Sequence, residues 1–143
     1  MTDRLVIDNS VIMAWCFRDV GDGYADAVLS SLVDAEALVP GIWPLEVANV
    51  LVAAERRGRL KETDSTRFLA LLADLPLRVI QESPQRITGE ILALARETGL
   101  SSYDASYLDL AMREGEPLAT LDEGLRKAAA KVGVELFQEE GKG

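Results

Sequence analysis

Four acidic residues, Asp8, Glu46, Asp104 and Asp122, stand where an apolar stretch of the sequence ends or where a helix is expected to begin. Carboxylates bind hard divalent cations, which can assist the hydrolysis of phosphate esters. In open α/β folds, ligands bind where the carboxyl ends of parallel strands meet the first turns of helices. The four acids can therefore act together only if the elements that carry them bring them to one such edge.

Taken singly, each acid has an ordinary structural explanation. Asp122 stands at a typical helix N-cap, and Glu46 and Asp104 fall in first helical turns, where negative side chains oppose the helix dipole. Asp8 is harder to explain in this way, because it ends an apolar run in which an unpaired charge is costly to bury. Taken together, the acids would repel one another unless they were protonated, solvated or neutralised by a cation.

The residue types that are missing narrow the chemistry. The chain has 143 residues, no histidine and one cysteine. Imidazole acid–base catalysis, Cys/His zinc clusters and an intrachain disulfide are therefore excluded. Oxygen ligands alone favour Mg²⁺ or Mn²⁺. Calcium is disfavoured, because the sequence has no contiguous loop of alternating acids and glycine like that of the EF-hand.

Charge and hydropathy limit the partners. A formal net charge of −9 argues against binding nucleic acid by bulk electrostatics, so such a substrate would need cations and a local basic patch. A basic protein partner meets no such obstacle. No secretory signal is evident, and no apolar stretch approaches the roughly 20 residues that span a bilayer. We therefore expect a cytoplasmic protein with no membrane partner.

Short apolar runs alternate with helical patterns along the chain. Strands are expected over residues 5–8, 37–40, 77–80, 117–121 and 134–137, and helices over residues 24–35, 44–57, 63–73, 84–99, 102–115 and 122–133. Residues 11–17 are expected to form a short helix or a turn. This alternation predicts an α/β fold with three layers, α/β/α, around a central, mainly parallel sheet of about four to five short strands. We expect a single domain over residues 1–138 and a frayed tail over residues 139–143.

Further polar residues lie near the acids. Three of them could orient a carboxylate or a metal-bound water: Ser10, Thr120 and Asn49. Asn49 lies one helical turn beyond Glu46. The two hydroxyls could equally form a local turn or belong to an ordinary strand. Asp109 follows Asp104 by five residues, which turns it by about 140° around a helix. We expect Asp109 to face solvent or to be an accessory acid.

Four segments in order resemble those of PIN-domain ribonucleases, in particular the VapC-type toxins of bacterial toxin–antitoxin pairs. They are VIDNSV at residues 6–11, PLEVANVL at 44–51, SSYDASYLDLA at 101–111 and PLATLDEGLRKAA at 117–129. The resemblance covers nearly the whole chain. It implies a PIN-like fold and places the acidic metal-site residues of the family on Asp8, Glu46, Asp104 and Asp122, with Ser10 and Thr120 in supporting positions.

The same resemblance implies an activity. It indicates a Mg²⁺- or Mn²⁺-dependent endoribonuclease that cuts structured RNA such as tRNA or rRNA, acts as a homodimer and is silenced by a cognate antitoxin whose C-terminal segment enters the cleft. Within this hypothesis we expect Asp8 and Asp104 to bind the ion directly. Asp122 and Glu46 would bind through water or hold a second ion.

Contacts with RNA would need local positive charge and stacking surfaces. The densest basic cluster comprises Arg56, Arg57, Arg59 and Lys61, which could bind RNA phosphates or merely solvate the end of a helix. Aromatic residues such as Tyr103 and Tyr107 could stack on bases, although aromatics beside apolar runs more often belong to the core or to an interface.

Two other classes of function deserve comparison. A phosphoacceptor receiver domain also carries a Mg²⁺-binding acidic pocket, but it would need a second acid beside Asp8, where Asn9 stands, and a lysine after a late strand. A phosphatase with an Asp-x-Asp nucleophile would need an acid at the position of Ser10. The alternative to an enzyme is a noncatalytic or receiver-like Mg²⁺-binding regulatory module.

Overall fold

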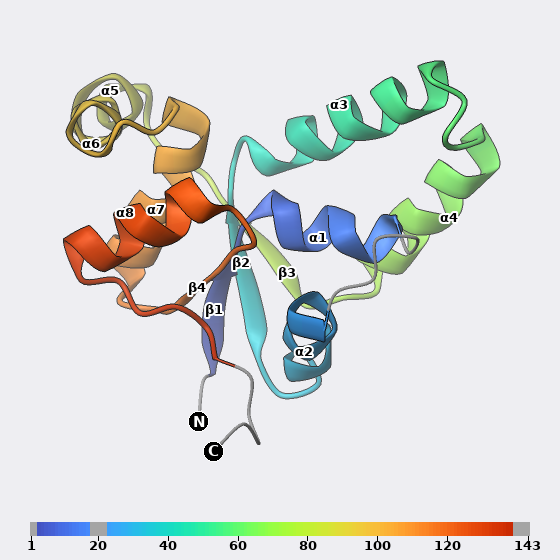
Figure 1. The fold of residues 1–143 in the computed structure, drawn as a ribbon, viewed down its shortest axis with the longest axis horizontal. Helices are drawn as coiled ribbons and strands as arrows, with labels where there is room; N and C mark the ends of the chain where they lie inside the picture. The colour runs from blue at the N-terminus through green and yellow to red at the C-terminus, as the bar shows by residue number, and fades with distance from the viewer. Residues whose placement is uncertain (1–2, 18–22, 139–143) are drawn as a thin grey trace.

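The computed structural model describes residues 3–17 and 23–138, and Figure 1 traces their path. The expected frayed tail lies outside these residues. Within them, no helix is both long enough and apolar enough to cross a membrane.

The centre of the fold is a parallel sheet with the strand order β3-β2-β1-β4. The strands are β1 (Arg4–Ile7), β2 (Glu36–Pro40), β3 (Leu77–Ile80) and β4 (Leu118–Ala119). In the register, Val6 stands opposite Leu38 on one side and Leu118 on the other. Because β1 has a neighbour on each side, its carboxyl end lies at the middle of the sheet edge.

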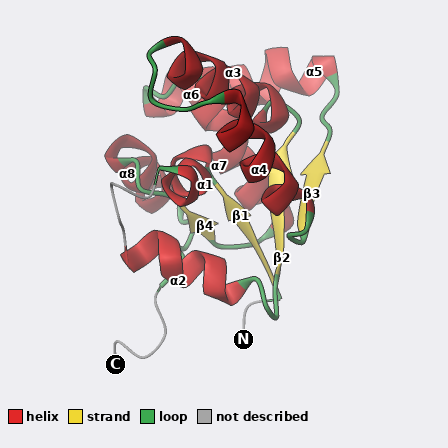
Figure 2. Ribbon diagram, turned by 90° about the vertical axis from the view of Figure 1, so that its right-hand side faces the viewer, coloured by secondary structure: helices red, strands yellow, loops and turns green. Residues whose placement is uncertain are grey.

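Helices cover both faces of the sheet. Figure 1 shows α1 (Asn9–Cys16), α2 (Gly23–Ser31), α3 (Trp43–Arg56) and α4 (Glu62–Ala73) on one side. The other side carries α5 (Pro84–Arg86), the π-helix η2 (Ile87–Ile91), α6 (Leu92–Thr98), α7 (Ser102–Glu114) and α8 (Glu123–Val132). Figure 2 shows the layers from a perpendicular direction. The predicted three-layer α/β/α class is confirmed.

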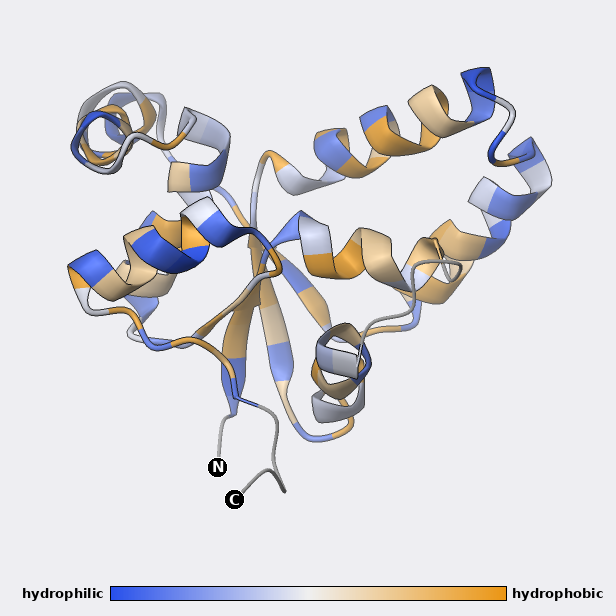
Figure 3. Cartoon of the chain, viewed as in Figure 1, coloured by the Kyte–Doolittle hydropathy of each residue, from blue (hydrophilic) through white to orange (hydrophobic). Residues whose placement is uncertain are grey.

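The core lies between the layers. Leu5, Val6 and Ile7 of β1 are fully buried, as are Val11 and Ile12 of α1. Burying each such side chain contributes about 1.5–3 kcal/mol relative to its exposed state. Figure 3 shows hydrophobic residues along the strands and α1, and hydrophilic residues at the turn between α3 and α4. The strand that precedes Asp8 is therefore anchored in the core.

The last strands are shorter than predicted. β4 stops at Ala119, because the next backbone N–H groups bond to side chains: Leu121 N donates to Ser10 Oγ at 3.0 Å, and Asp122 N to Thr120 Oγ1 at 3.0 Å. The expected strand over residues 134–137 is reduced to a single parallel bridge between Leu136 and Leu118. Because β4 has only two residues, it gives residues 134–137 no longer strand to pair with.

The helix expected over residues 84–99 is not continuous. Ser83 caps it, since its Oγ accepts from Arg86 N at 3.2 Å. A π-helical segment then interrupts it over Ile87–Ile91. The hydroxyl of Thr88 donates to the carbonyl of Pro84 at 3.0 Å, and Gly89 lies within the same segment. Both residue types weaken regular α-helical bonding.

Asp109 is buried, so the first of the two alternatives expected for it, a position facing solvent, is wrong. Its Oδ1 accepts from Arg86 Nη2 at 2.9 Å, and its Oδ2 from Arg113 Nε at 3.1 Å. Glu82 Oε2 bridges the same two guanidinium groups at 2.6 and 3.0 Å. The face of α7 that carries Asp109 packs against the segment carrying Arg86. The four charges join the end of β3, α5 and α7.

Replacing Asp109 with Asn tests this network. The variant keeps the side-chain shape but removes the charge shared by two arginines, and we expect the free energy of unfolding to fall by about 2 kcal/mol, between the values for buried and exposed ion pairs. Urea denaturation measures it. Glu90→Gln is the matched control, because Glu90 also pairs with Arg86 but its side chain is 64% exposed. Equal losses for the two variants would contradict the assignment.

Candidate active site

The site begins with Asp8, the residue that follows the central strand β1. Its backbone N–H donates to Ala119 O at 3.0 Å, which ties it to β4. The residue is only 5% exposed. Although Asp8 is the N-cap residue of α1, its side chain makes no capping hydrogen bond. Capping therefore does not explain this carboxylate.

Two hydroxyls hold the Asp8 carboxylate. Ser10 Oγ and Thr120 Oγ1 each donate to Asp8 Oδ2 at 2.6 Å. Both hydroxyls also accept a backbone N–H, from Leu121 and Asp122 respectively. The two predicted supporting residues thus contact the carboxylate and join the end of β1 to the end of β4. Neither of them occupies Asp8 Oδ1.

Asp122 is exposed and opens α8 as its N-cap residue. Its Oδ2 accepts from Leu125 N at 2.8 Å, so the capping explanation holds for this acid. A Cβ atom at Gly124 would lie 3.3 Å from the same oxygen, so glycine leaves room for the carboxylate there. Arg126 Nε donates to Thr120 O at 2.8 Å and so fixes the loop between β4 and α8.

Glu46 lies in the first turn of α3, after Pro44. Its Oε1 accepts a hydrogen bond of 2.5 Å from the hydroxyl of Tyr107, a fully buried residue of α7. Burial raises the pKa of Tyr107, as does this bond to Glu46, so the phenol keeps its proton. Sequence reasoning did not assign this role, although Tyr107 follows Asp104 by three residues and therefore shares its face of the helix.

Asp104 lies in the first turn of α7 and is half-buried. Its backbone N–H donates to Ser101 Oγ at 3.1 Å, so Ser101 is the cap of α7. The helix start is therefore satisfied by a serine, and the carboxylate of Asp104 is not needed for capping. Asp8 and Glu46 likewise have side chains that cap no helix.

Burial raises the pKa of Asp8, Glu46 and Asp104, and it is the largest cause for each. Hydrogen bonds from Ser10 and Thr120 oppose the rise at Asp8, and Tyr107 opposes it at Glu46. The acids also act on one another. Asp122 raises the pKa of Asp8, Asp8 and Asp104 raise that of Glu46, and Asp8 and Asp122 raise that of Asp104.

The four acids thus share one electrostatic field. Among residues 3–17 and 23–138, however, no three acidic or other metal-binding side chains are close enough to form a ready-made metal cluster. The carboxylates are near enough to repel one another but are not drawn together around one point.

Other predicted residues lie apart from this group. Asn49 is exposed on α3, and no hydrogen bond of the described residues joins it to the acids. The basic cluster, Arg56, Arg57, Arg59 and Lys61, is exposed at the far end of α3 and in the following turn. Ten residues of helix separate Arg56 from Glu46, or about 15 Å along the axis. The Arg59 guanidinium lies 4.5 Å from the centre of the Phe17 ring.

The family model described as PIN domain matches residues 5–131, a range that contains all four acids. The chain belongs to the PIN domain family. Ribonuclease VapC3 of Pyrobaculum aerophilum is 31% identical over 122 residues, which cover 85% of this chain and 92% of that protein. The predicted family is confirmed.

Solved structures share the fold of this PIN domain. PAE2754 from Pyrobaculum aerophilum is 25% identical with a TM-score of 0.68, and the match covers 90% of this chain and 87% of the other. A toxin–antitoxin complex from Klebsiella pneumoniae is 20% identical with a TM-score of 0.64, over 93% and 96%. VapBC2 from Rickettsia felis, bound to a promoter DNA fragment, is 14% identical with a TM-score of 0.67, over 94% and 97%.

The donor chemistry of this PIN domain fits a hard divalent cation. All the donors in the group are oxygens, and burial and mutual repulsion raise the pKa of three of the four carboxyls. A cation would relieve that repulsion without a proton. Mg²⁺ and Mn²⁺ suit such ligands, so the donor type and the charge agree, and the direct ligands stay a prediction.

Replacing Thr120 with Val tests the hydroxyl that holds Asp8. Valine fills nearly the same space but cannot donate to the buried carboxylate, so we expect the free energy of unfolding at neutral pH to fall by about 1–3 kcal/mol. Chemical denaturation measures the loss. Thr66→Val, on the exposed face of α4, is the control and should change stability by less than about 0.5 kcal/mol. Similar losses at both positions would reject the role of Thr120.

The raised pKa of Asp8 predicts a pH dependence in metal-free protein. The folded state holds a proton on Asp8 more readily than the unfolded state, for which the ordinary pKa is 3.8. The resulting stabilisation is fully present below that ordinary value and is lost as the pH rises through the raised folded value. Between about pH 4 and pH 8, stability should therefore decline more in the wild type than in Asp8→Asn.

Urea denaturation in the presence of a chelator, at stepped pH values, measures this difference. Asp34→Asn serves as the control, because Asp34 is an exposed acid and its variant should follow the wild type. Parallel curves for the wild type and Asp8→Asn would contradict the prediction.

Proposed function

We propose that this chain is a metal-dependent endoribonuclease that hydrolyses phosphodiester bonds in structured RNA such as tRNA or rRNA, as the toxin of a toxin–antitoxin pair in the cytoplasm. The observation that carries the proposal is the buried Asp8 carboxylate, which two hydroxyls hold in a shared electrostatic field with Glu46, Asp104 and Asp122. The relative named Ribonuclease VapC3 supports the choice of RNA as substrate.

The proposed cofactor is Mg²⁺, with Mn²⁺ as the alternative. Asp8 and Asp104 would hold it directly, and Asp122 and Glu46 through water or around a second ion. When bound, such a cation neutralises charge on the scissile phosphate and lowers the pKa of water. The chain contributes by orientation: Ser10 and Thr120 fix Asp8 Oδ2, and Tyr107 fixes Glu46 Oε1.

Glu46 is the carboxylate best suited to orient the attacking water, because Asp8 and Asp104 are assigned to the ion itself. It is half-buried, and burial raises its pKa, so it can exchange a proton more readily than an exposed acid. With no histidine in the chain, carboxylates are the side chains left for this task. Asn49 could add a hydrogen bond farther along α3.

RNA binding requires positive charge away from the acids. The basic cluster of Arg56, Arg57, Arg59 and Lys61 is exposed and could pair with phosphates about 15 Å from Glu46 along α3. It therefore suits RNA some nucleotides from the cut rather than the scissile phosphate itself.

We also propose a cognate antitoxin and a homodimer as partners. An apolar groove of about 330 Å³ lies between α3, α4 and the start of β3, with Trp43, Val47, Leu69 and Leu72 among its lining residues. Leu45 and Leu69 are 67% and 47% exposed nearby. An apolar antitoxin segment would cover this surface, and an arginine or lysine from it could pair with the acids. Toxin–antitoxin complexes among the similar folds support such a partner.

Cleavage of total RNA tests the enzymatic proposal. Purified wild type should cut RNA with Mg²⁺ or Mn²⁺ and not with a chelator. Asp8→Asn and Asp104→Asn should keep the fold, measured by circular dichroism, and lose at least about 100-fold in rate, because each removes a charged ligand. Asp34→Asn, an exposed acid remote from the group in sequence, should cut like the wild type.

The design separates an enzyme from a regulatory module. Equal cleavage by the wild type and both Asn variants, or none that depends on metal, would sink the proposal and favour a noncatalytic Mg²⁺-binding domain. Calorimetric titration of Mg²⁺ into the same proteins would then distinguish a metal-binding module from a chain that binds no metal.

A further inference from the structure

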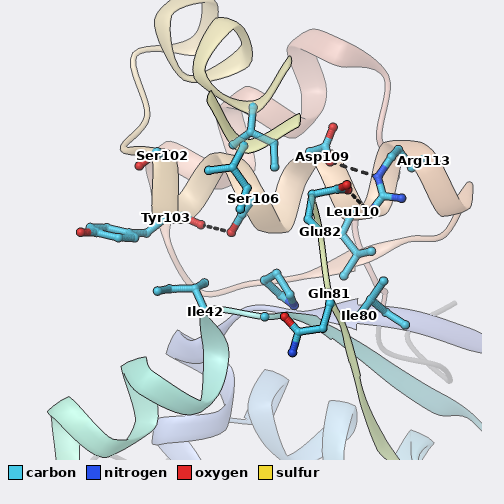
Figure 4. Close-up of a pocket in the computed structure, with 14 residues that line it drawn as sticks. Ile42, Ile80, Gln81, Glu82, Ser102, Tyr103, Ser106, Asp109, Leu110 and Arg113 are labelled. Carbon is cyan, nitrogen blue, oxygen red and sulfur yellow. Dashed lines mark hydrogen bonds and ion pairs between the residues drawn. The ribbon is translucent and has the colours of Figure 1, made fainter. Parts of the chain in front are cut away.

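A second pocket lies beside the acidic group and is shown in Figure 4. It has a volume of about 290 Å³ and lies between the carboxyl ends of β2 and β3, the π-helix and α7. Apolar side chains such as Ile80, Ile91 and Leu110 line much of it, and polar groups of Gln81, Ser102 and Ser106 are also present. A small, mostly apolar pocket with a few polar groups is typical of a site for a small flat ligand.

One end of the pocket adjoins the candidate catalytic residues. Tyr103 and Ile42 lie at that end in Figure 4, whereas Arg113 and Ile80 lie at the other. Tyr103 immediately precedes Asp104 on α7, and the carbonyl of Ile42 accepts the backbone N–H of Glu46 at 3.0 Å. This end of the pocket is therefore formed by the chain segments that carry Glu46 and Asp104.

The pocket can accept part of a polyanion, because its own acids are neutralised. Glu82 pairs with Arg86 and Arg113, and Asp109 pairs with the same two arginines. The lining thus carries no uncompensated carboxylate, in contrast to the neighbouring acidic group. An uncharged ring can enter while the phosphate attached to its sugar stays outside.

Two side chains have the properties of base-binding groups. Tyr103 is 58% exposed, and its ring projects from α7 in Figure 4, so one face can stack on a base. The Gln81 amide lies close over Gly41, where a Cβ atom would collide with Gln81 Oε1. Glycine therefore allows the amide to lie against the backbone at the pocket wall, where it can hydrogen-bond to a base edge.

We propose that this pocket binds a single unpaired nucleobase adjoining the scissile phosphate, with Tyr103 as the stacking ring and Gln81 contacting the base edge. This inference rests on the proposed ribonuclease function and specifies its substrate. A pocket of about 290 Å³ admits one base but not a base pair. The cut therefore falls where RNA is single-stranded or where a base leaves its stack, and Gln81 contributes to the choice of base.

Fluorescent RNA tests the proposal without cleavage. A short single-stranded RNA that carries one 2-aminopurine is mixed with the Asp8→Asn variant in the presence of Mg²⁺. A set of such RNAs places the 2-aminopurine at successive positions. At one position, binding should quench the fluorescence. Tyr103→Ala should remove that quenching and weaken binding about tenfold, whereas Tyr103→Phe keeps the ring and should stay within about twofold.

A second variant fills the pocket from its wall. Ser106→Phe introduces a ring into the cavity and should abolish the quenching at the same position while the salt dependence of RNA binding stays unchanged. Thermal melting of each variant confirms that it is folded. Unchanged quenching in both Tyr103→Ala and Ser106→Phe would overturn the proposal.

Two further outcomes keep the hypotheses distinct. If wild type cleaves no RNA but the quenching depends on Tyr103, the ribonuclease proposal fails and the base pocket stands. If Tyr103→Ala leaves the quenching intact but converts a dimer to a monomer in sedimentation, the surface joins two copies of the chain and the base-pocket proposal fails.

Discussion

Asp8 holds a carboxyl group almost out of water at the end of the central strand β1, and much of the site depends on how that group is held. An isolated buried carboxylate is costly, but Ser10 and Thr120 each donate to the same oxygen at 2.6 Å. The same hydroxyls accept backbone N–H groups from the loop after β4. This small hydrogen-bond network therefore stabilises the Asp8 carboxylate, ends β4 and positions Asp122.

The rest of the acidic group extends this arrangement across the sheet edge. Glu46 and Asp104 come from helices on opposite faces, and Tyr107 joins those faces by donating to Glu46. Repulsion among the acids favours the uptake of either a proton or a cation. On the other side of the same edge, Glu82 and Asp109 are already neutralised by arginines. The two regions differ in charge although both are rich in carboxylates.

Local sequence patterns predicted much of this fold and identified the four acids, because each strand end, proline and helix cap is recognised from a few neighbouring residues. The predicted shortness of the strands and the order of the elements follow from such signals. Tyr107 and Asp109 were harder, because Glu46, the partner of Tyr107, is 61 residues away and Arg86, one of the two partners of Asp109, is 23 residues away. The π-helix was not predicted, because it interrupts an otherwise regular helical pattern.

The first turn of α3 belongs to two surfaces at once. Trp43 lines the apolar groove against α4, while Glu46, three residues later, takes part in the acidic group. A helix moves as a nearly rigid body, so an occupant of the groove that tilts α3 also displaces the Glu46 carboxylate. Binding in the groove and binding at the acids are then coupled. If an occupant of the groove weakens cation binding by some factor, the cation weakens binding of that occupant by the same factor.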